Sequence, residues 1–188
     1  MALLRLFGLG VVLAVAGVVA STSATAAQLL TQDEALALAF EGATPERHTA
    51  YLGDAELEQA RRLAGRDVQI ESTVVTYYVA RRGAETLGVA YFDAHRVRTV
   101  QEVLMVVVGP DDRIRRIETV SFREPPEYRA PDGWLRLFES HRLDAALSLR
   151  GDVPNMTGAT LTSGAVTRSA RRVLALHEVI APFGGAGP

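Results

Sequence analysis

The sequence predicts an α+β domain in which helices cover a single antiparallel sheet. Four consecutive segments, at 68–79, 87–92, 102–108 and 114–122, are rich in residues that favour strands. Short turn sequences separate these segments, which predicts an antiparallel meander. Helix-patterned segments stand before and after the four strands, so we expect these helices to pack on the sheet.

Capping signals and apolar spacing predict the individual helices. Thr31 and Glu34 have the spacing of a capping box at the start of a helix over 31–40. A second helix over 54–64 is followed by Gly65, and a final helix over 164–180 carries its apolar residues mostly on one face. Short helices are expected at 134–138 and at 143–149.

Composition excludes several classes of site. The 188 residues carry a formal net charge of −2, and no basic tract is present, so no nucleic-acid partner is expected. The absence of cysteine excludes disulfides, thiolate metal sites, iron–sulfur clusters and covalent c-type haem. The four histidines do not fall at metal-ligand spacing, and we expect no metal site.

The N-terminus has the pattern of an export signal. Arg5 precedes an uninterrupted apolar run over 6–20, and Ala24-Thr25-Ala26 fits the A-x-A cleavage pattern. The run is short for a membrane-spanning helix, which needs roughly 20 residues. We therefore expect a signal peptide over 1–26, either cleaved or kept as a single N-terminal membrane anchor, and a periplasmic or secreted protein.

The segment T-G-A-T-L-T-S at 157–163 combines a glycine, small residues and hydroxyl side chains before the final helix. A helix N-terminus offers unpaired N–H donors and a partial positive charge, and Gly158 permits a sharp turn or a close approach to a ligand. This composition suits a phosphate group. The same residues also fit a simple loop and helix cap.

This segment closely resembles the flavinylation motif of the FMN-binding domain family. That family includes the C subunit of the sodium-pumping NADH:quinone oxidoreductase and the G subunit of the Rnf electron-transfer complex. The resemblance covers roughly residues 68–180 and implies FMN joined to Thr160 by a phosphoester bond. It also implies attachment by a separate flavin transferase that uses FAD and Mg²⁺. The resemblance identifies the cofactor-binding loop as Thr157, Gly158, Ala159, Thr160, Leu161, Thr162 and Ser163. The N–H groups around Leu161 to Ser163 and the hydroxyls of Thr162 and Ser163 can hold the phosphate oxygens that stay charged.

Two segments depart from the pattern of the family. An aspartate usually stands three residues before the [S/T]-G-A-T segment, whereas this chain has Pro154 there and its nearest aspartate is Asp152. Many members also carry an H-x-E-T block after the last strand. Glu124 matches its glutamate, while Phe122 and Pro125 replace the histidine and the threonine. The first departure bears on the efficiency of modification by the transferase, and the altered block leaves the role of Glu124 open.

Three further residues are candidates to contact the flavin. Glu124 either accepts a hydrogen bond from a flavin N–H or a nearby backbone donor, or it is a solvated turn carboxylate. Tyr128 and Trp134 either line the isoalloxazine ring or pack in the core. By contrast, the basic residues at 95–98 predict a solvated loop, with a contact for a redox partner or a phosphate as the alternative, and Glu102 is expected to be an ordinary charge at a strand edge.

The expected organisation is a signal segment at 1–26, an N-terminal helical region at 27–66, an FMN-binding domain at 67–181 and a flexible tail at 182–188. The resemblance implies an exported electron carrier that passes electrons between membrane or periplasmic redox partners and has no substrate chemistry of its own. Two alternatives stay open: an exported binding or scaffold module without flavin, and the small flavin subunit of a larger membrane redox complex.

Overall fold

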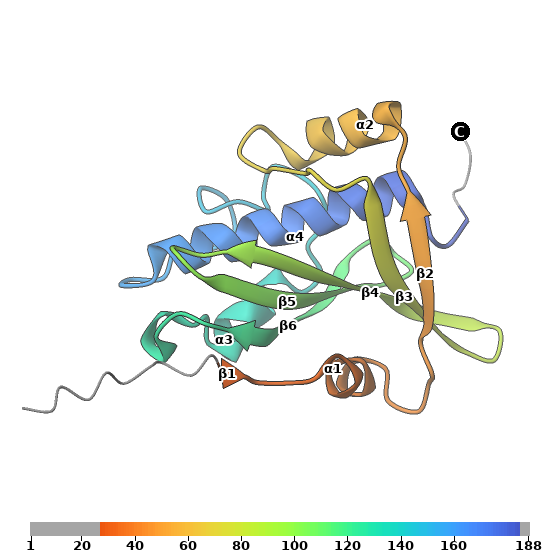
Figure 1. Ribbon diagram of the computed structural model, residues 1–188, viewed down its shortest axis with the longest axis horizontal. Helices are drawn as coiled ribbons and strands as arrows, with labels where there is room; N and C mark the ends of the chain where they lie inside the picture. The colour runs from red at the N-terminus through yellow and green to blue at the C-terminus, as the bar shows by residue number, and fades with distance from the viewer. Residues whose placement is uncertain (1–26, 185–188) are drawn as a thin grey trace, which may run out of the picture.

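The computed structural model describes residues 27–184 and contains one antiparallel sheet flanked by helices (Figure 1). This arrangement confirms the predicted α+β class. The six strands have the spatial order β1-β6-β5-β4-β3-β2, so β3 to β6 form the expected meander. Their bounds are β1 Ala27–Gln28, β2 Glu46–Tyr51, β3 Val74–Arg82, β4 Glu85–Arg96, β5 Gln101–Val108 and β6 Ile114–Phe122.

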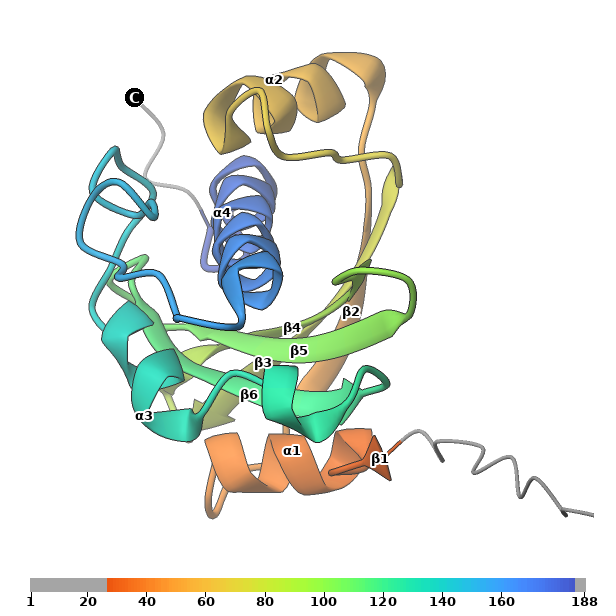
Figure 2. The ribbon, with the colours of Figure 1, turned by 90° about the vertical axis from the view of Figure 1, so that its left-hand side faces the viewer.

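The helices lie on both faces of the sheet. Helix α4 packs on one face and α2 lies over α4, whereas α1 covers the opposite face (Figure 2). Short helical turns follow β6 and lead toward the loop before α4. The bounds are α1 Gln32–Ala39, α2 Asp54–Ala64, η1 Pro126–Tyr128, α3 Asp132–Leu135, η2 Arg136–Phe138 and α4 Thr160–Ile180.

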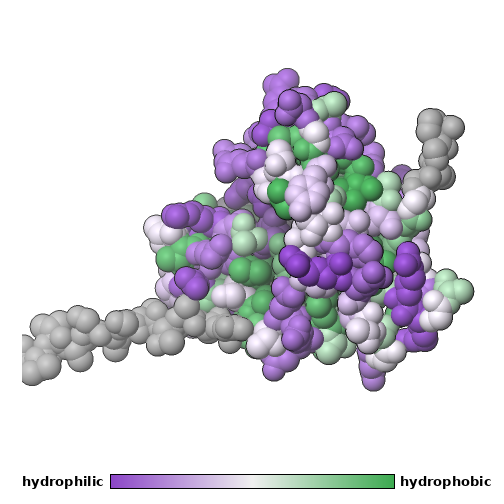
Figure 3. Space-filling view, turned by 45° about the vertical axis from the view of Figure 1, so that its right-hand side comes forward, coloured by the Kyte–Doolittle hydropathy of each residue, from purple (hydrophilic) through white to green (hydrophobic). Residues whose placement is uncertain are grey.

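Several local predictions are confirmed. The capping box is present, because the Thr31 hydroxyl accepts from the Glu34 N–H while the Glu34 carboxylate accepts from the Thr31 N–H. Helix α2 has the expected bounds, and Gly65 follows it with a φ of +99°. Its amphipathic pattern places hydrophilic residues outward, which gather over α2 at the top of Figure 3.

Two strand predictions need correction. The segment expected to begin a strand at Val68 joins the sheet only at Val74. Val68 and Ile70 are buried as the pattern indicates, but arginine side chains of the helices take the carbonyls that a neighbouring strand would otherwise use. Arg61 donates to the Ile70 carbonyl and Arg172 to the Gln69 carbonyl. Strand β2, with the charged sequence ERHTAY, was not expected, and it pairs with β3 at the sheet edge.

Two helix predictions also need correction. The expected helix over 143–149 is absent, because the Asp144 carboxylate accepts from the N–H groups of Ala146 and Leu147 in a local turn. Arg171 then takes the carbonyls of Asp144 and Leu147. Helix α4 begins at Thr160 instead of residue 164, so most of the T-G-A-T-L-T-S segment belongs to its first turn.

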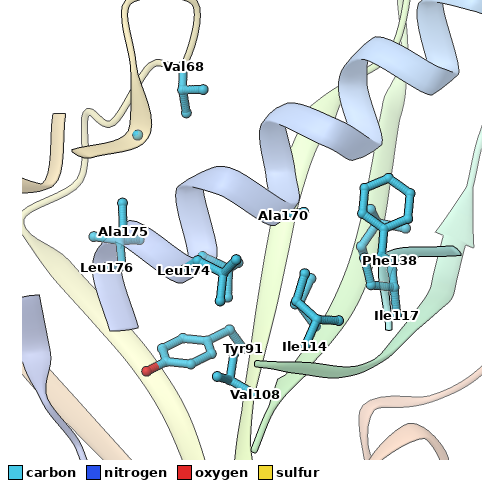
Figure 4. Packing of buried hydrophobic residues seen from close by; sticks show 14 of the residues in the cluster. Val68, Tyr91, Val108, Ile114, Ile117, Phe138, Ala170, Leu174, Ala175 and Leu176 are labelled. Atoms are coloured by element: carbon cyan, nitrogen blue, oxygen red, sulfur yellow. The ribbon is translucent and has the colours of Figure 1, made fainter. Parts of the chain in front are cut away.

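The principal core lies between α4 and the sheet. Ala170 and Leu174 of α4 face Tyr91, Val108 and Ile114 of the strands (Figure 4). Leu57, Ala60 and Ala64 of α2 belong to the same cluster, so α4 is covered on its outer side as well. The helix is therefore held along most of its length, with its N-terminal turn next to the β4–β5 connection (Figure 1).

The expected signal segment lies outside the described residues, as do residues 185–188 of the expected tail. The region expected to be helical, 27–66, supplies α1 and α2 together with strands β1 and β2 of the same sheet. Across residues 27–184, none of the helices has the length and apolar character needed to cross a membrane.

Candidate functional site

The T-G-A-T-L-T-S segment forms a tight loop that runs directly into α4. Gly158 has a φ of +84°, a conformation that other residues adopt at a cost, and Ala159 caps the helix without a side-chain hydrogen bond. Thr160 is the first helical residue and is exposed. Within the described part of the chain, the N–H groups of Thr160, Leu161 and Thr162 have no hydrogen-bond acceptor. The helix therefore begins with unpaired donors beside an exposed hydroxyl.

The four hydroxyls of this segment divide into two pairs. Thr162 Oγ1 donates to the Tyr128 carbonyl at 2.7 Å. Ser163 Oγ donates to the Ala159 carbonyl at 3.1 Å and accepts from the Met156 N–H at 3.0 Å. Both side chains are buried, so they fix the loop against the helix, whereas Thr157 and Thr160 are exposed. Thr157 and Thr160 are thus the two hydroxyls that a large reagent can reach.

Tyr128 lies beside the first turns of α4. Its backbone carbonyl receives the Thr162 hydrogen bond, and its ring packs against the small cluster of Val97, Phe122 and Ala165. The guanidinium of Arg98 lies 5.4 Å from the ring centroid. The aromatic ring is therefore within the neighbourhood of the loop and is partly buried there.

Trp134 bonds the chain just before the loop. Its indole N–H donates to the Pro154 carbonyl at 2.8 Å, and its ring meets Phe138 edge-on with centroids 5.1 Å apart. The ring also packs against the principal core. In this structure Trp134 thus packs as a core residue does and also anchors the chain just before the T-G-A-T-L-T-S segment.

Glu124 accepts hydrogen bonds from the turn between β4 and β5. Its carboxylate accepts from the Thr99 N–H at 2.9 Å and from the Val100 N–H at 3.2 Å. The hydrogen bond from the Thr99 backbone is the main cause that lowers the pKa of this carboxyl group below its usual value. Glu124 therefore carries a negative charge that orders the turn adjoining Val97 and Tyr128.

A cleft of about 950 Å³ opens beside α4 and was not anticipated from the sequence. Strands β3 and β4 form its floor, the segment before β3 forms one wall, and α4 forms the other through Ala165, Arg168 and Arg172. Its volume is comparable with the roughly 300–1,000 Å³ of small-molecule sites. No spacing in the sequence indicates this cleft, because the irregular segment 65–73 builds its wall.

A chain of buried charges lies under α4 at this cleft. Arg172 donates to both carboxylate oxygens of Asp93, at 2.8 and 2.7 Å. His95 bridges Asp93 and Glu102 through its two ring nitrogens, at 3.0 and 2.9 Å. The prediction of a solvated loop at His95 is wrong, as is the prediction of an ordinary edge charge at Glu102. His95 belongs to β4 with a side chain only 8% exposed, and Glu102 is fully buried.

The ionisation of this chain follows from its hydrogen bonds. Burial alone would lower the pKa of His95, but the hydrogen bonds to Asp93 and Glu102 outweigh burial and raise it to about 9. Burial alone would raise the pKa of Asp93, yet His95 and Arg172 hold it below its usual value. His95 is therefore a cation at neutral pH and shares its charge between two carboxylates.

No group of three or more metal-ligating side chains with suitable geometry occurs between residues 27 and 184. The chemical groups gathered around the start of α4 are instead hydroxyls, backbone donors, aromatic rings and arginine. This set suits an anionic, aromatic ligand.

Comparison with known proteins gives one family. The chain matches none of the curated proteins against which it was compared. The model of the FMN-binding domain family matches residues 101–175, from β5 to the last turns of α4. The matched segment contains Glu124, Tyr128, Trp134 and the whole of the T-G-A-T-L-T-S loop. This match confirms the resemblance, and residues 101–175 carry the pattern of the FMN-binding domain family.

Proposed function

We propose that this protein is an exported electron carrier with FMN esterified to the hydroxyl of Thr160. The main support for this proposal is the position of Thr160. Its exposed side chain lies at the first residue of α4, next to three N–H groups that have no acceptor among residues 27–184, and inside the segment that matches the FMN-binding domain. The family match supports a flavin-binding electron carrier in general, and the covalent bond, the export and the partners are the proposed refinements.

The residues of the loop fit an esterified phosphate. The oxygens that stay charged after esterification would be held by the N–H groups of Thr160, Leu161 and Thr162, where the helix dipole also favours an anion. Thr162 and Ser163 would act mainly by fixing the shape of the loop, because their hydroxyls already bond Tyr128, Ala159 and Met156. This assigns them a smaller direct part in holding the phosphate than the sequence suggested.

Bound FMN would supply the ability to accept and release one or two electrons. The residues of this chain would bind and orient it. Tyr128 offers a partly buried aromatic surface beside the first turns of α4, and Glu124 keeps the neighbouring turn ordered, although neither residue lines the cleft beside α4. Trp134 would act indirectly, since it packs in the core and holds the Pro154 carbonyl.

The partners follow from the same proposal. A flavin transferase that uses FAD and Mg²⁺ would attach the cofactor to the exposed loop, in which Thr157, Gly158, Thr160 and Leu161 are accessible. The electron donor and acceptor would be membrane or periplasmic redox proteins. The modest net charge suits a small and transient contact with each of them.

Replacement of the proposed attachment residue tests this function. The wild-type chain and Thr160→Ala are each expressed with the N-terminal segment and with a flavin transferase, and intact mass and in-gel flavin fluorescence are measured after denaturation. We expect an FMN-sized mass increase and fluorescence for the wild type and neither for Thr160→Ala. The thermal unfolding of the two unmodified chains should agree, because Thr160 is exposed and makes no side-chain hydrogen bond in the described structure.

Thr157→Ser is the matched control, since it alters the other exposed hydroxyl residue of the loop and keeps the [S/T]-G-A-T pattern. It should keep the full mass increase. A wild-type chain without flavin would contradict the proposal and favour an exported binding module, and flavin that persists on Thr160→Ala would contradict the assignment of the residue.

A further inference from the structure

Arg168 differs from the other arginines of α4. Arg171 donates to the carbonyls of Ala64, Asp144 and Leu147, and Arg172 donates to Gln69 and Asp93. Arg168 is partly buried, yet in the described part of the chain its guanidinium has neither a hydrogen bond nor an ion pair. Its guanidinium nitrogens still reach solvent, so their N–H donors and positive charge are available to an anionic ligand.

The side chain of Arg168 points back toward the start of the helix. One guanidinium nitrogen lies 3.0 Å from the position that a Cβ on Gly164 would occupy. Helical side chains lean toward the N-terminus, and Gly164 leaves room for Arg168 to lie flat along the preceding turn. The guanidinium therefore lies about one turn, or roughly 6 Å along the axis, from the level of Thr160.

The cleft beside α4 begins at this same place. Ala165 and Arg168 line it on the helix side, and His95 and Arg96 line it on the sheet side. Asp93 and Glu102 offset the charges of Arg172 and His95, as described above. Arg168 thus contributes a positive charge that has no ion-pair partner among the described residues, at the end of the cleft nearest the loop.

We propose that the cleft beside α4 receives the isoalloxazine ring of the FMN carried on Thr160, and that Arg168 is a positioning residue that stabilises the reduced ring. This inference rests on the function proposed above. The oxidised ring is neutral. An external donor that supplies two electrons, with one proton taken up from solvent at N5, converts it to an anion whose charge lies near N1 and the C2 carbonyl. A cation at this edge favours the anion and raises the midpoint potential.

The first experiment measures the midpoint potential of the covalent flavin by equilibrium titration with dithionite. Arg168→Gln should lower the ratio of reduced to oxidised flavin about tenfold at a fixed potential, which for a two-electron couple corresponds to about 30 mV. Arg168→Lys should keep most of the wild-type potential because it keeps the charge. Arg62→Gln is the control: Arg62 is exposed on α2, outside the cleft, and its loss should leave the potential unchanged.

The second experiment locates the ring without changing Arg168. Glu71 lines the cleft, is exposed and has no side-chain hydrogen bond in the described structure. A tryptophan introduced by Glu71→Trp would contact a ring bound there and quench its fluorescence. Glu58→Trp, on α2 outside the cleft, should leave the fluorescence at its wild-type value.

The two proposals fail in different ways. A chain that carries no FMN contradicts the proposed function. A chain that carries FMN on Thr160, but whose potential is unaffected by Arg168→Gln and whose fluorescence is unaffected by Glu71→Trp, contradicts the placement of the ring alone. If Glu71→Trp quenches the flavin fluorescence but Arg168→Gln leaves the midpoint potential unchanged, the ring lies in the cleft and the proposed role of Arg168 is wrong.

Discussion

The two ends of α4 are built in opposite ways. Toward its C-terminus, His177 is buried between the Tyr91 hydroxyl at 2.9 Å and the Asp112 carboxylate at 3.1 Å. In the middle, Arg171 and Arg172 bond backbone carbonyls of neighbouring segments. At its N-terminus, Thr160 and Leu161 are exposed, and the first N–H groups are unpaired in the described structure.

This contrast explains how a short, exposed turn can carry a site. The proposed covalent cofactor would require a hydroxyl that a transferase can reach, so Thr160 would have to be accessible before modification. The precision of the site must then come from the remainder of the helix, which the sheet, α2 and the buried charges hold in place. Substitutions along the remainder of α4 should therefore change the stability of the fold, and substitutions in its first turn should change flavin attachment.

Loss of His95 should have the largest effect on stability. His95→Ala leaves the buried carboxylate of Glu102 without its cation, and one oxygen of Glu102 already lacks a hydrogen-bond partner. Breaking a buried ion pair from one side costs about 3–5 kcal/mol, so urea unfolding at neutral pH should show a loss of that size. The double variant His95→Ala/Glu102→Gln should recover part of it, and an equal loss in the double variant would contradict the pairing.

The His95 contribution also has a defined pH dependence. The pKa of His95 is 6.5 when unperturbed and about 9 in the fold, so its stabilisation is complete below 6.5 and is lost as the pH rises through 9. The difference in unfolding free energy between wild type and His95→Ala should shrink across this range. A difference that stays constant from below 6.5 to above 9 would mean that His95 is not a cation in the fold.

Tyr91→Phe should have an intermediate effect on stability. Tyr91 bonds His177 near the C-terminal end of α4. Burial lowers the pKa of His177, although Asp112 opposes the shift, so the ring is neutral at pH 7. A carboxylate can only accept, which makes Nε2 the donor to Asp112 and Nδ1 the acceptor of the Tyr91 hydroxyl. Loss of this hydroxyl leaves a buried acceptor unpaired and should cost about 1–3 kcal/mol in denaturant unfolding.

Tyr77→Phe is the matched control for Tyr91→Phe. Tyr77 stacks on the Tyr91 ring with centroids 5.8 Å apart, but its hydroxyl makes no hydrogen bond with a described residue. We expect little change in stability for this variant. Equal losses for the two tyrosines would show that the Tyr91 hydroxyl contributes nothing specific.

Gly158→Ala should have the smallest effect on stability. Gly158 has a φ of +84°, and no atom lies within 4 Å of the position that a Cβ would take there, so the cost is one of backbone conformation alone, about 1–2 kcal/mol. Thermal unfolding should show this loss in the unmodified chain. Gly133→Ala, within α3, should be neutral or stabilising by comparison, and an equal loss at both positions would contradict the role of the left-handed turn.

Much of the fold could be predicted, because local signals and tertiary packing agree there. The capping box at Thr31, the bounds of α2 and the strand Ile114–Phe122 all rest on local patterns. The segment 68–73 could not be predicted, since Arg61 and Arg172 from distant helices bond its carbonyls. An arginine that binds a backbone carbonyl leaves no periodic pattern in the sequence.

The candidate site could be predicted only in part. The T-G-A-T-L-T-S segment identifies the loop, because it resembles the motif of the FMN-binding domain family and lies within the residues that the family model matches. The cleft and the unpaired Arg168 depend on how α4 lies against the sheet, which no spacing encodes. Likewise, His95 and Glu102 are ordinary polar residues in the sequence, and only the register of β4 against β5 places them opposite each other.

The most direct test of the account is to locate the flavin on the chain. Trypsin cleaves after Arg150 and Arg168, which places the whole loop in one peptide over 151–168. Fragmentation of this peptide from flavin-loaded protein should place the FMN mass on Thr160. FMN on the buried Ser163 or Thr162, or on the exposed Thr157, would contradict the claim that the first hydroxyl of α4 carries the cofactor.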